Sequence, residues 1–168
     1  MSMKARLSKL IAIFIIASSG HIHWAIAQNS TQNEPKIACL NVKTLKAPQL
    51  YGIWQVTFTS PPAGLPSTAL LLLEKHAEFS DSLAGTVSRE AVSANGHSAK
   101  AALAGDVEDG FVILDESSNN ISISGTWNGE LTQTSCGREV KGVWKDTSAN
   151  AAPDAPDVAF VMVKRPGW

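Results

Sequence analysis

A glycine stands two residues before a tryptophan in three segments of this chain, 52–54, 125–127 and 142–144. The same spacing occurs with valine in place of tryptophan at 85–87 and 105–107. In a β-strand, residues i and i+2 point to the same face. A glycine lets a strand bend sharply, and a large neighbour on that face can fill the space it leaves. The repeat therefore favours a small, strongly curved and closed sheet.

Apolar and polar residues alternate along most of the chain, which is the pattern of half-buried β-strands. In the first such segment Trp54, Val56 and Phe58 share one face. Residues typical of turns separate the segments. The predicted strands are 51–59, 69–75, 82–88, 99–105, 110–116, 121–131, 138–145 and 157–164, and a short helical turn is predicted within 42–50.

Consecutive strands with short connections predict an all-β fold, an eight-stranded antiparallel up-and-down β-barrel. A two-sheet sandwich would show the same alternation, but it gives less reason for the repeated glycines. In such a barrel, alternate connections lie at the same end. The long connections 60–68, 89–98 and 146–156 would gather at one end, where ligands of barrels commonly bind.

The N-terminus has the features of a signal peptide. Lys4, Arg6 and Lys9 precede the apolar run 10–17, and a small-residue motif predicts cleavage after Ala27. The apolar run is shorter than the roughly 20 residues that span a bilayer, although an uncleaved anchor is the alternative. We expect a periplasmic or secreted protein with no membrane span in the mature chain. The predicted parts are a signal peptide (1–27), an N-terminal extension (28–50) and the β-barrel domain (51–168).

The chain has two cysteines, Cys39 and Cys136. In an oxidising compartment such a pair predicts a disulfide, with two free thiols as the alternative. Closing so long a loop would contribute about 4–5 kcal/mol in the chain-entropy model. The bridge would tie the N-terminal extension to the end of the barrel with the compact turns. His76 and His97 are isolated from other ligand-type residues, so no metal site is predicted.

Charge and motifs argue against several functions. The formal net charge is −1 and the basic residues of the predicted mature chain are scattered, so we expect no nucleic-acid partner. No Gly-x-Ser-x-Gly motif is present, and the adjacent Asp115 and Glu116 would face opposite sides of a strand. We predict no enzyme, no catalytic residue, no metal and no cofactor.

The inward positions near the predicted mouth are the candidate ligand site. Arg89 would pair with an anionic or polar ligand group there, or else extend into solvent. Filling of the core is the alternative role of the tryptophans. The candidate ligand-binding residues are Trp54, Phe58, Val87, Arg89, Trp127 and Trp144.

These residues suggest an exported barrel that binds a small hydrophobic or amphipathic ligand at the long-loop end. The alternative is a secreted or periplasmic interaction module, such as an inhibitor or envelope scaffold, with a filled core. Segments 69–73, 111–114 and 158–163 are apolar on both faces. A homo-oligomer or the N-terminal segment would cover them, unless the patches are small enough to be tolerated.

The order of motifs resembles that of the avidin/streptavidin-type barrels, and lipocalin-like barrels share part of it. The similar features are Gly52-x-Trp54, the Leu-x-Gly-Thr of 83–86, the Trp-x-Gly of 127–129, Trp144 and the last strand, 160–164. The resemblance implies a small-ligand barrel.

The positions that hold biotin in that family differ here. The family's Asn and Ser after the first strand fall in 57–60, which reads Thr-Phe-Thr-Ser; its Tyr falls at Val87 and its next Ser at Arg89. Its fifth-strand Trp falls near Asp115 and its last-strand Asp at Val158, and only Trp144 is retained. A site without buried polar partners for the ligand loses much affinity. We therefore expect no tight biotin binding.

Overall fold

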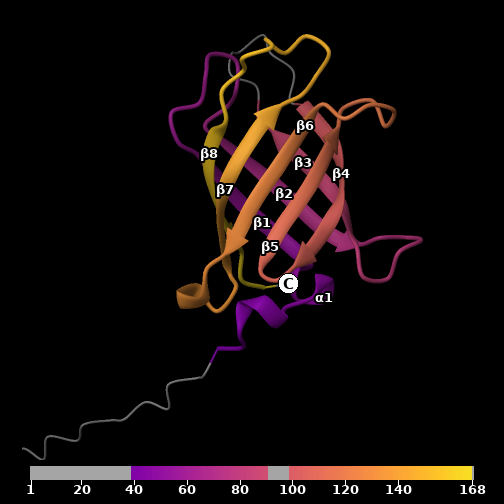
Figure 1. Cartoon of the computed structure of the whole chain (residues 1–168), viewed down its shortest axis with the longest axis vertical. Helices are drawn as coiled ribbons and strands as arrows, with labels where there is room; N and C mark the ends of the chain where they lie inside the picture. Colours follow the sequence, from indigo (N-terminus) through magenta and orange to yellow (C-terminus); the bar gives the residue numbers. More distant parts are fainter. Residues whose placement is uncertain (1–38, 91–98, 168) are drawn as a thin grey trace, which may run out of the picture. The chain divides into compact units, whose positions relative to one another are not determined.

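The computed structural model describes residues 39–90 and 99–167. Eight strands pair in chain order, and β8 pairs with β1 to close the barrel (Figure 1). All neighbouring pairs are antiparallel, so the predicted up-and-down barrel is confirmed. The strands are β1 (Gly52–Phe58), β2 (Thr68–Lys75), β3 (Leu83–Arg89), β4 (Ala99–Glu108), β5 (Phe111–Ser117), β6 (Gly125–Leu131), β7 (Glu139–Asp146) and β8 (Val158–Lys164).

The alternation in the sequence places the core inside the barrel. Along β1, Trp54, Val56 and Phe58 are buried, while Thr57 on the other face is exposed. The same phase continues around the sheet, because neighbouring strands pair in register with their inward residues side by side. The core is therefore a packed interior built from every strand.

The predicted long connections 60–68 and 146–156 lie at the same end of the barrel, while most of the predicted connection 89–98 lies outside the described residues. Three described loops, 59–67, 118–124 and 147–157, lie at one end, which we call the mouth (Figure 1). At the other end, the closed end, β4 and β5 are joined by Asp109 and Gly110, with φ of 50° and 85°. Aspartate followed by glycine is a typical pair for such left-handed hairpin positions.

A short N-terminal segment covers the closed end. It forms η1 (Val42–Thr44) and α1 (Ala47–Leu50), in agreement with the helical turn predicted there. Ala47 and Leu50 have no exposed surface. The indole Nε1–H of Trp54 donates to the carbonyl of Leu50 over 2.8 Å, which joins α1 to the barrel core.

The predicted disulfide Cys39–Cys136 is present and ties this segment to the barrel. Its two Cα atoms lie 4.9 Å apart, although 97 positions separate them in the sequence. Gln133 supports the same connection, because its side chain accepts from the Val42 amide and donates to the Leu40 carbonyl, both over 3.0 Å. The segment is therefore held at one covalent point and by several hydrogen bonds.

The prediction that a strand begins at residue 121 is wrong. Strand β6 begins at Gly125, and Ile121 and Ile123 are exposed in the preceding loop. The side-chain oxygen of Asn119 accepts hydrogen bonds from the amides of Ile121 and Ser122 over 2.9 and 3.0 Å. An asparagine that binds nearby backbone in this way competes with strand pairing. The alternation thus continues for four residues into a loop.

Gly125 is one member of the glycine repeat, and it lies against an aromatic ring. A Cβ atom built at this position would lie 2.6 Å from Nε1 of Trp144. Trp144 lies on β7, next to β6, and its indole occupies the space over the glycine. At Gly125 the large aromatic therefore comes from the neighbouring strand, whereas a Cβ at Gly85, Gly105 or Gly142 would meet the backbone of the strand beside it.

The outer faces that the sequence marks as apolar remain partly exposed. Leu70, Phe111, Ile113 and Val163 are exposed large apolar residues on the outer surface. Covering of these residues by a second copy of the chain stays a prediction.

Among the described residues, no helix has both the length and the apolar character needed to cross a membrane. The predicted signal peptide lies outside the described residues. The disulfide is consistent with an oxidising compartment such as the periplasm or the cell exterior.

Candidate functional site

All six predicted ligand-site residues point into the barrel, but they form two groups. Trp54 lies at the closed end, under α1. Val87 lies at the same level, because Leu71 of β2 pairs with both Trp54 and Val87. The other four, Phe58, Arg89, Trp127 and Trp144, come together just inside the mouth, and we call them the mouth group.

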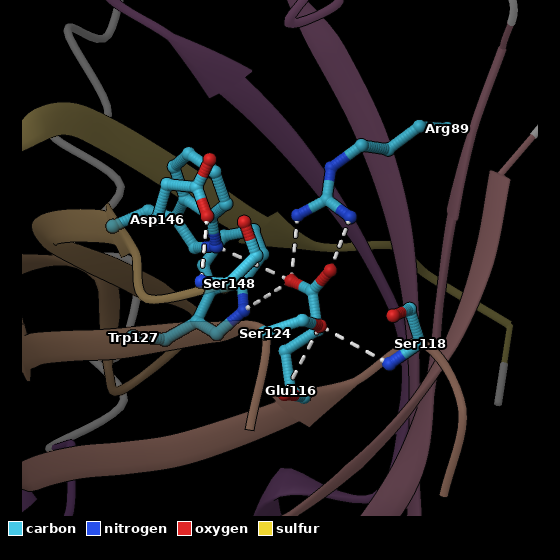
Figure 2. Close-up of polar contacts among 8 residues, drawn as sticks. Arg89, Glu116, Ser118, Ser124, Trp127, Asp146 and Ser148 are labelled. Atoms are coloured by element: carbon cyan, nitrogen blue, oxygen red, sulfur yellow. Dashed lines mark hydrogen bonds and ion pairs between the residues drawn. The ribbon is translucent and has the colours of Figure 1, made fainter. Parts of the chain in front are cut away.

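An ion pair that the sequence did not reveal connects the mouth group. Arg89 is the last residue of β3 and Glu116 lies near the end of β5, with β4 between them. The two terminal nitrogens of the Arg89 guanidinium donate to the two carboxylate oxygens of Glu116 over 2.6 and 2.7 Å (Figure 2). Only 8% and 6% of these side chains are exposed, so the pair is buried.

Both tryptophans of the mouth group bind the same carboxylate. The Nε1–H groups of Trp127 and Trp144 donate to one oxygen of Glu116 over 3.1 and 3.2 Å. The Arg89 guanidinium carbon also lies 5.6 and 5.3 Å from the centroids of the two indole rings. Contacts of this length between a cation and an aromatic face are favourable, more so in a desolvated place.

Phenylalanines complete the aromatic surroundings. The ring centroid of Phe58 lies 5.6 Å from that of Trp127 and 6.1 Å from that of Trp144. Phe160 packs edge-on against Trp127 at 5.1 Å. These separations are the ones that aromatic pairs prefer. The ion pair is therefore enclosed by rings on the side facing the core.

Taking two charges out of water costs several kcal/mol for each ion, and good hydrogen bonding has to offset that cost. Glu116 receives four donors, two from Arg89 and one from each indole. Within the part of the chain that the structure describes, the Nε atom of Arg89 is the buried side-chain nitrogen without a hydrogen-bond partner. The carboxylate is satisfied, whereas the Nε–H of the guanidinium has no partner among the described residues.

Local structure fixes the direction of Glu116. Val112, Leu114 and Glu116 alternate on the inward face of β5, so the carboxylate enters the barrel by strand phase alone. The backbone of Glu116 is also held, because its carbonyl accepts from the Ser124 amide over 2.7 Å and from the Ser124 hydroxyl over 3.3 Å (Figure 2). The loop before β6 thus positions the residue that anchors the mouth.

The deeper interior is filled by side chains. Trp54, Leu71 and Val87 are 0% exposed, so a water molecule reaches none of their surface. The arrangement packs aromatic and aliphatic groups against one another and satisfies the indole N–H groups within the chain. Chemically, the mouth group can hold two opposite charges in a fixed geometry.

Comparison with models of known protein families and with curated proteins gives no match. The closed eight-stranded antiparallel barrel is compatible with avidin-like and lipocalin-like folds.

Sequence reasoning did not identify Glu116 as an interior residue. Adjacent residues of a strand face opposite sides, and the pair Asp115–Glu116 does not by itself show which of the two faces inward. Continuing the alternation of 112 and 114 by one step would have placed Glu116 inside. Its partner could not be found this way, because Arg89 lies 27 positions away and meets it only in the closed sheet.

Proposed function

We propose that this chain is an exported, non-enzymatic interaction module. It recognises its partner through its outer surface, while its own side chains fill the barrel. One observation carries the proposal: the buried Arg89–Glu116 pair occupies the interior next to the mouth and binds the indole groups of Trp127 and Trp144.

The ion pair opposes the entry of a small apolar ligand. Such a ligand would have to displace Arg89 or Glu116 and leave the other charge buried without its partner. Separating a buried pair in this way costs about 3–5 kcal/mol. That cost is of the order of a thousandfold in affinity, since each 1.4 kcal/mol is a factor of about ten. A barrel interior with this penalty binds a hydrophobic molecule weakly.

The predicted export of the chain and its family resemblance support the rest of the proposal. The predicted signal peptide and the disulfide both fit an oxidising compartment outside the cytoplasm. The resemblance to avidin-type barrels favours the same architecture, while the replaced biotin-site positions favour a different use of it. Arg89 stands where that family has a serine, and its side chain lies in the interior.

The test is a titration of the purified mature protein with biotin, palmitate and haem, followed by native mass spectrometry and thermal denaturation. We expect no bound species and no change in melting temperature. A stoichiometric complex with any of the three, together with a rise in melting temperature, would overturn the proposal. The same mass spectra report the number of chains in the native particle.

A second candidate function is the binding of a small polar or anionic molecule at the mouth. The unpartnered Nε–H of Arg89 favours it, because a buried donor without a partner can donate a hydrogen bond to a ligand oxygen. The same titration, repeated with acetate and benzoate, separates the two candidates. Stabilisation by these anions that disappears in the R89M variant would favour the mouth site.

A further inference from the structure

A cleft of about 480 Å³ opens at the closed end of the barrel, away from the mouth group. The Cys39–Cys136 bridge and the apolar side chain of Leu45 form part of its lining. The cationic residues Arg138 and Lys164 line it as well. The cleft therefore combines an apolar wall with a concentration of positive charge.

The sheet directs Lys164 to this place. Val158, Phe160, Met162 and Lys164 alternate on the inward side of β8, so the last of them ends the inward row at the closed end. Its ammonium lies 5.9 Å from the Trp54 ring and donates to the Gln49 carbonyl over 2.7 Å. An ammonium has three donors, so two remain after this bond.

The cationic groups of the cleft form no ion pair with another described residue. The ion pairs of the described residues are Arg89–Glu116 inside the mouth and Glu139–Lys141 on the surface. Neither pair includes Arg138, Lys164 or the nearby Arg165. Arg165 also lines the cleft, and its guanidinium donates to the side-chain oxygen of Gln55 over 2.7 Å.

The titration of Lys164 agrees with this geometry. Burial lowers the pKa of Lys164 below its ordinary value, and the positive charge of Arg138 lowers it further. Two like charges held together in a partly buried place are a destabilised arrangement. A bound anion would relieve it.

We propose that this cleft binds a carboxylate carried beside an apolar side chain, as in an acidic segment of a partner polypeptide. Arg138 and Lys164 would hold the carboxylate, and Leu45 and the disulfide would contact the apolar group. The volume exceeds what an inorganic anion fills, and the apolar wall gives such an anion no further contact. This inference rests on the proposed interaction module, whose partner it describes chemically.

The test uses a labelled short peptide that alternates aspartate and leucine, with fluorescence anisotropy as the readout. The reference peptide has asparagine in place of aspartate. Variants K164M and R138Q remove one positive charge each, and K145Q removes the charge of an exposed lysine on the outer face of β7. Urea unfolding of each variant confirms that the fold is kept.

We expect the acidic peptide to bind, and K164M and R138Q each to weaken it by at least about tenfold, the effect of losing one charged hydrogen bond. K145Q should bind like the wild type. Equal binding of the two peptides, or equal binding by all variants, would overturn the proposal. Complete competition by millimolar inorganic phosphate, with no preference for the peptide, would overturn the assignment to a polypeptide.

The result separates this inference from the proposed function. If the peptide does not bind the cleft, the proposal that side chains fill the barrel still stands, because the titration with biotin, palmitate and haem tests that proposal separately. A bound small molecule inside the barrel would refute the interaction module even if the peptide bound the cleft.

Discussion

The Arg89–Glu116 pair makes a quantitative prediction about stability. Replacing Arg89 with methionine keeps an unbranched side chain but removes the guanidinium, and leaves the Glu116 carboxylate with the two indole donors. Replacing Glu116 with glutamine keeps an acceptor for the indoles and leaves the guanidinium without a counter-charge. Removing one member of a buried pair costs about 3–5 kcal/mol, and we expect each variant to lose this much.

The double variant R89M/E116Q removes both charges at once. Its loss in free energy of unfolding should be smaller than the sum of the two single losses by at least about 2 kcal/mol, because neither charge is left buried alone. The assay is urea unfolding followed by tryptophan fluorescence and circular dichroism, with the free energy of unfolding from linear extrapolation. Trp127 and Trp144 contact the pair directly, so fluorescence reports on the place that is changed.

Glu139 provides a matched control. It pairs with Lys141 over 3.2 Å, and 61% of the lysine side chain and 27% of the glutamate side chain are exposed. The same glutamate-to-glutamine change at Glu139 should cost less than about 1 kcal/mol, as exposed pairs do. Two results would refute the role of the buried pair in closing the interior. One is that R89M and E116Q lower the free energy of unfolding no more than E139Q does. The other is that the double variant R89M/E116Q loses as much as the two single variants together.

Three further predictions concern other parts of the barrel. Replacing Cys39 and Cys136 with alanine should lower the free energy of unfolding by about 2–5 kcal/mol, and an unchanged urea midpoint would contradict the disulfide's role. The Lys164 pKa lies below 10.5 in the folded chain, so the folded chain releases this proton at lower pH than the unfolded chain. The free energy of unfolding should therefore rise with pH between the pKa of Lys164 in the folded chain and 10.5. Urea unfolding curves recorded over this pH range should show a smaller rise for K164M than for the wild type. G125A should lower stability by about 1–3 kcal/mol, because the new methyl group meets the Trp144 indole, and an unchanged fluorescence maximum would argue against that contact.

The sequence contains enough information for the barrel because its pattern is local and repeated. Period-two alternation and frequent turn residues mark each strand, and the order of strands leaves few ways to close the sheet. Cys39 and Cys136 are equally easy to pair, because no other cysteine competes.

The candidate site was only half predictable, for a physical reason. Strand phase places Arg89, Trp127 and Trp144 inside, so the sequence identifies them. Their bonds depend on Glu116, whose charge argues against an interior position until its partner is known. That partner is set by the closure of the sheet, which no local pattern encodes.

At the start of β6 the alternation predicts more strand than the structure has. Ile121 and Ile123 continue a perfect alternation, yet they lie in a loop because the side-chain oxygen of Asn119 accepts from the amides of Ile121 and Ser122. A side-chain-to-backbone hydrogen bond of this kind overrides the periodic pattern over a few residues. Periodicity alone therefore misplaces the boundary of a strand next to such a turn.

The most direct test of the filled interior is a two-dimensional ¹H–¹⁵N spectrum of the tryptophan indole groups, recorded with and without biotin, palmitate and haem. The account predicts that the Trp127 and Trp144 signals exchange slowly with solvent, because both N–H groups are bound to buried Glu116, and that no ligand shifts them. Fast exchange of both signals, or a saturable shift of either on adding one of these ligands, would contradict it.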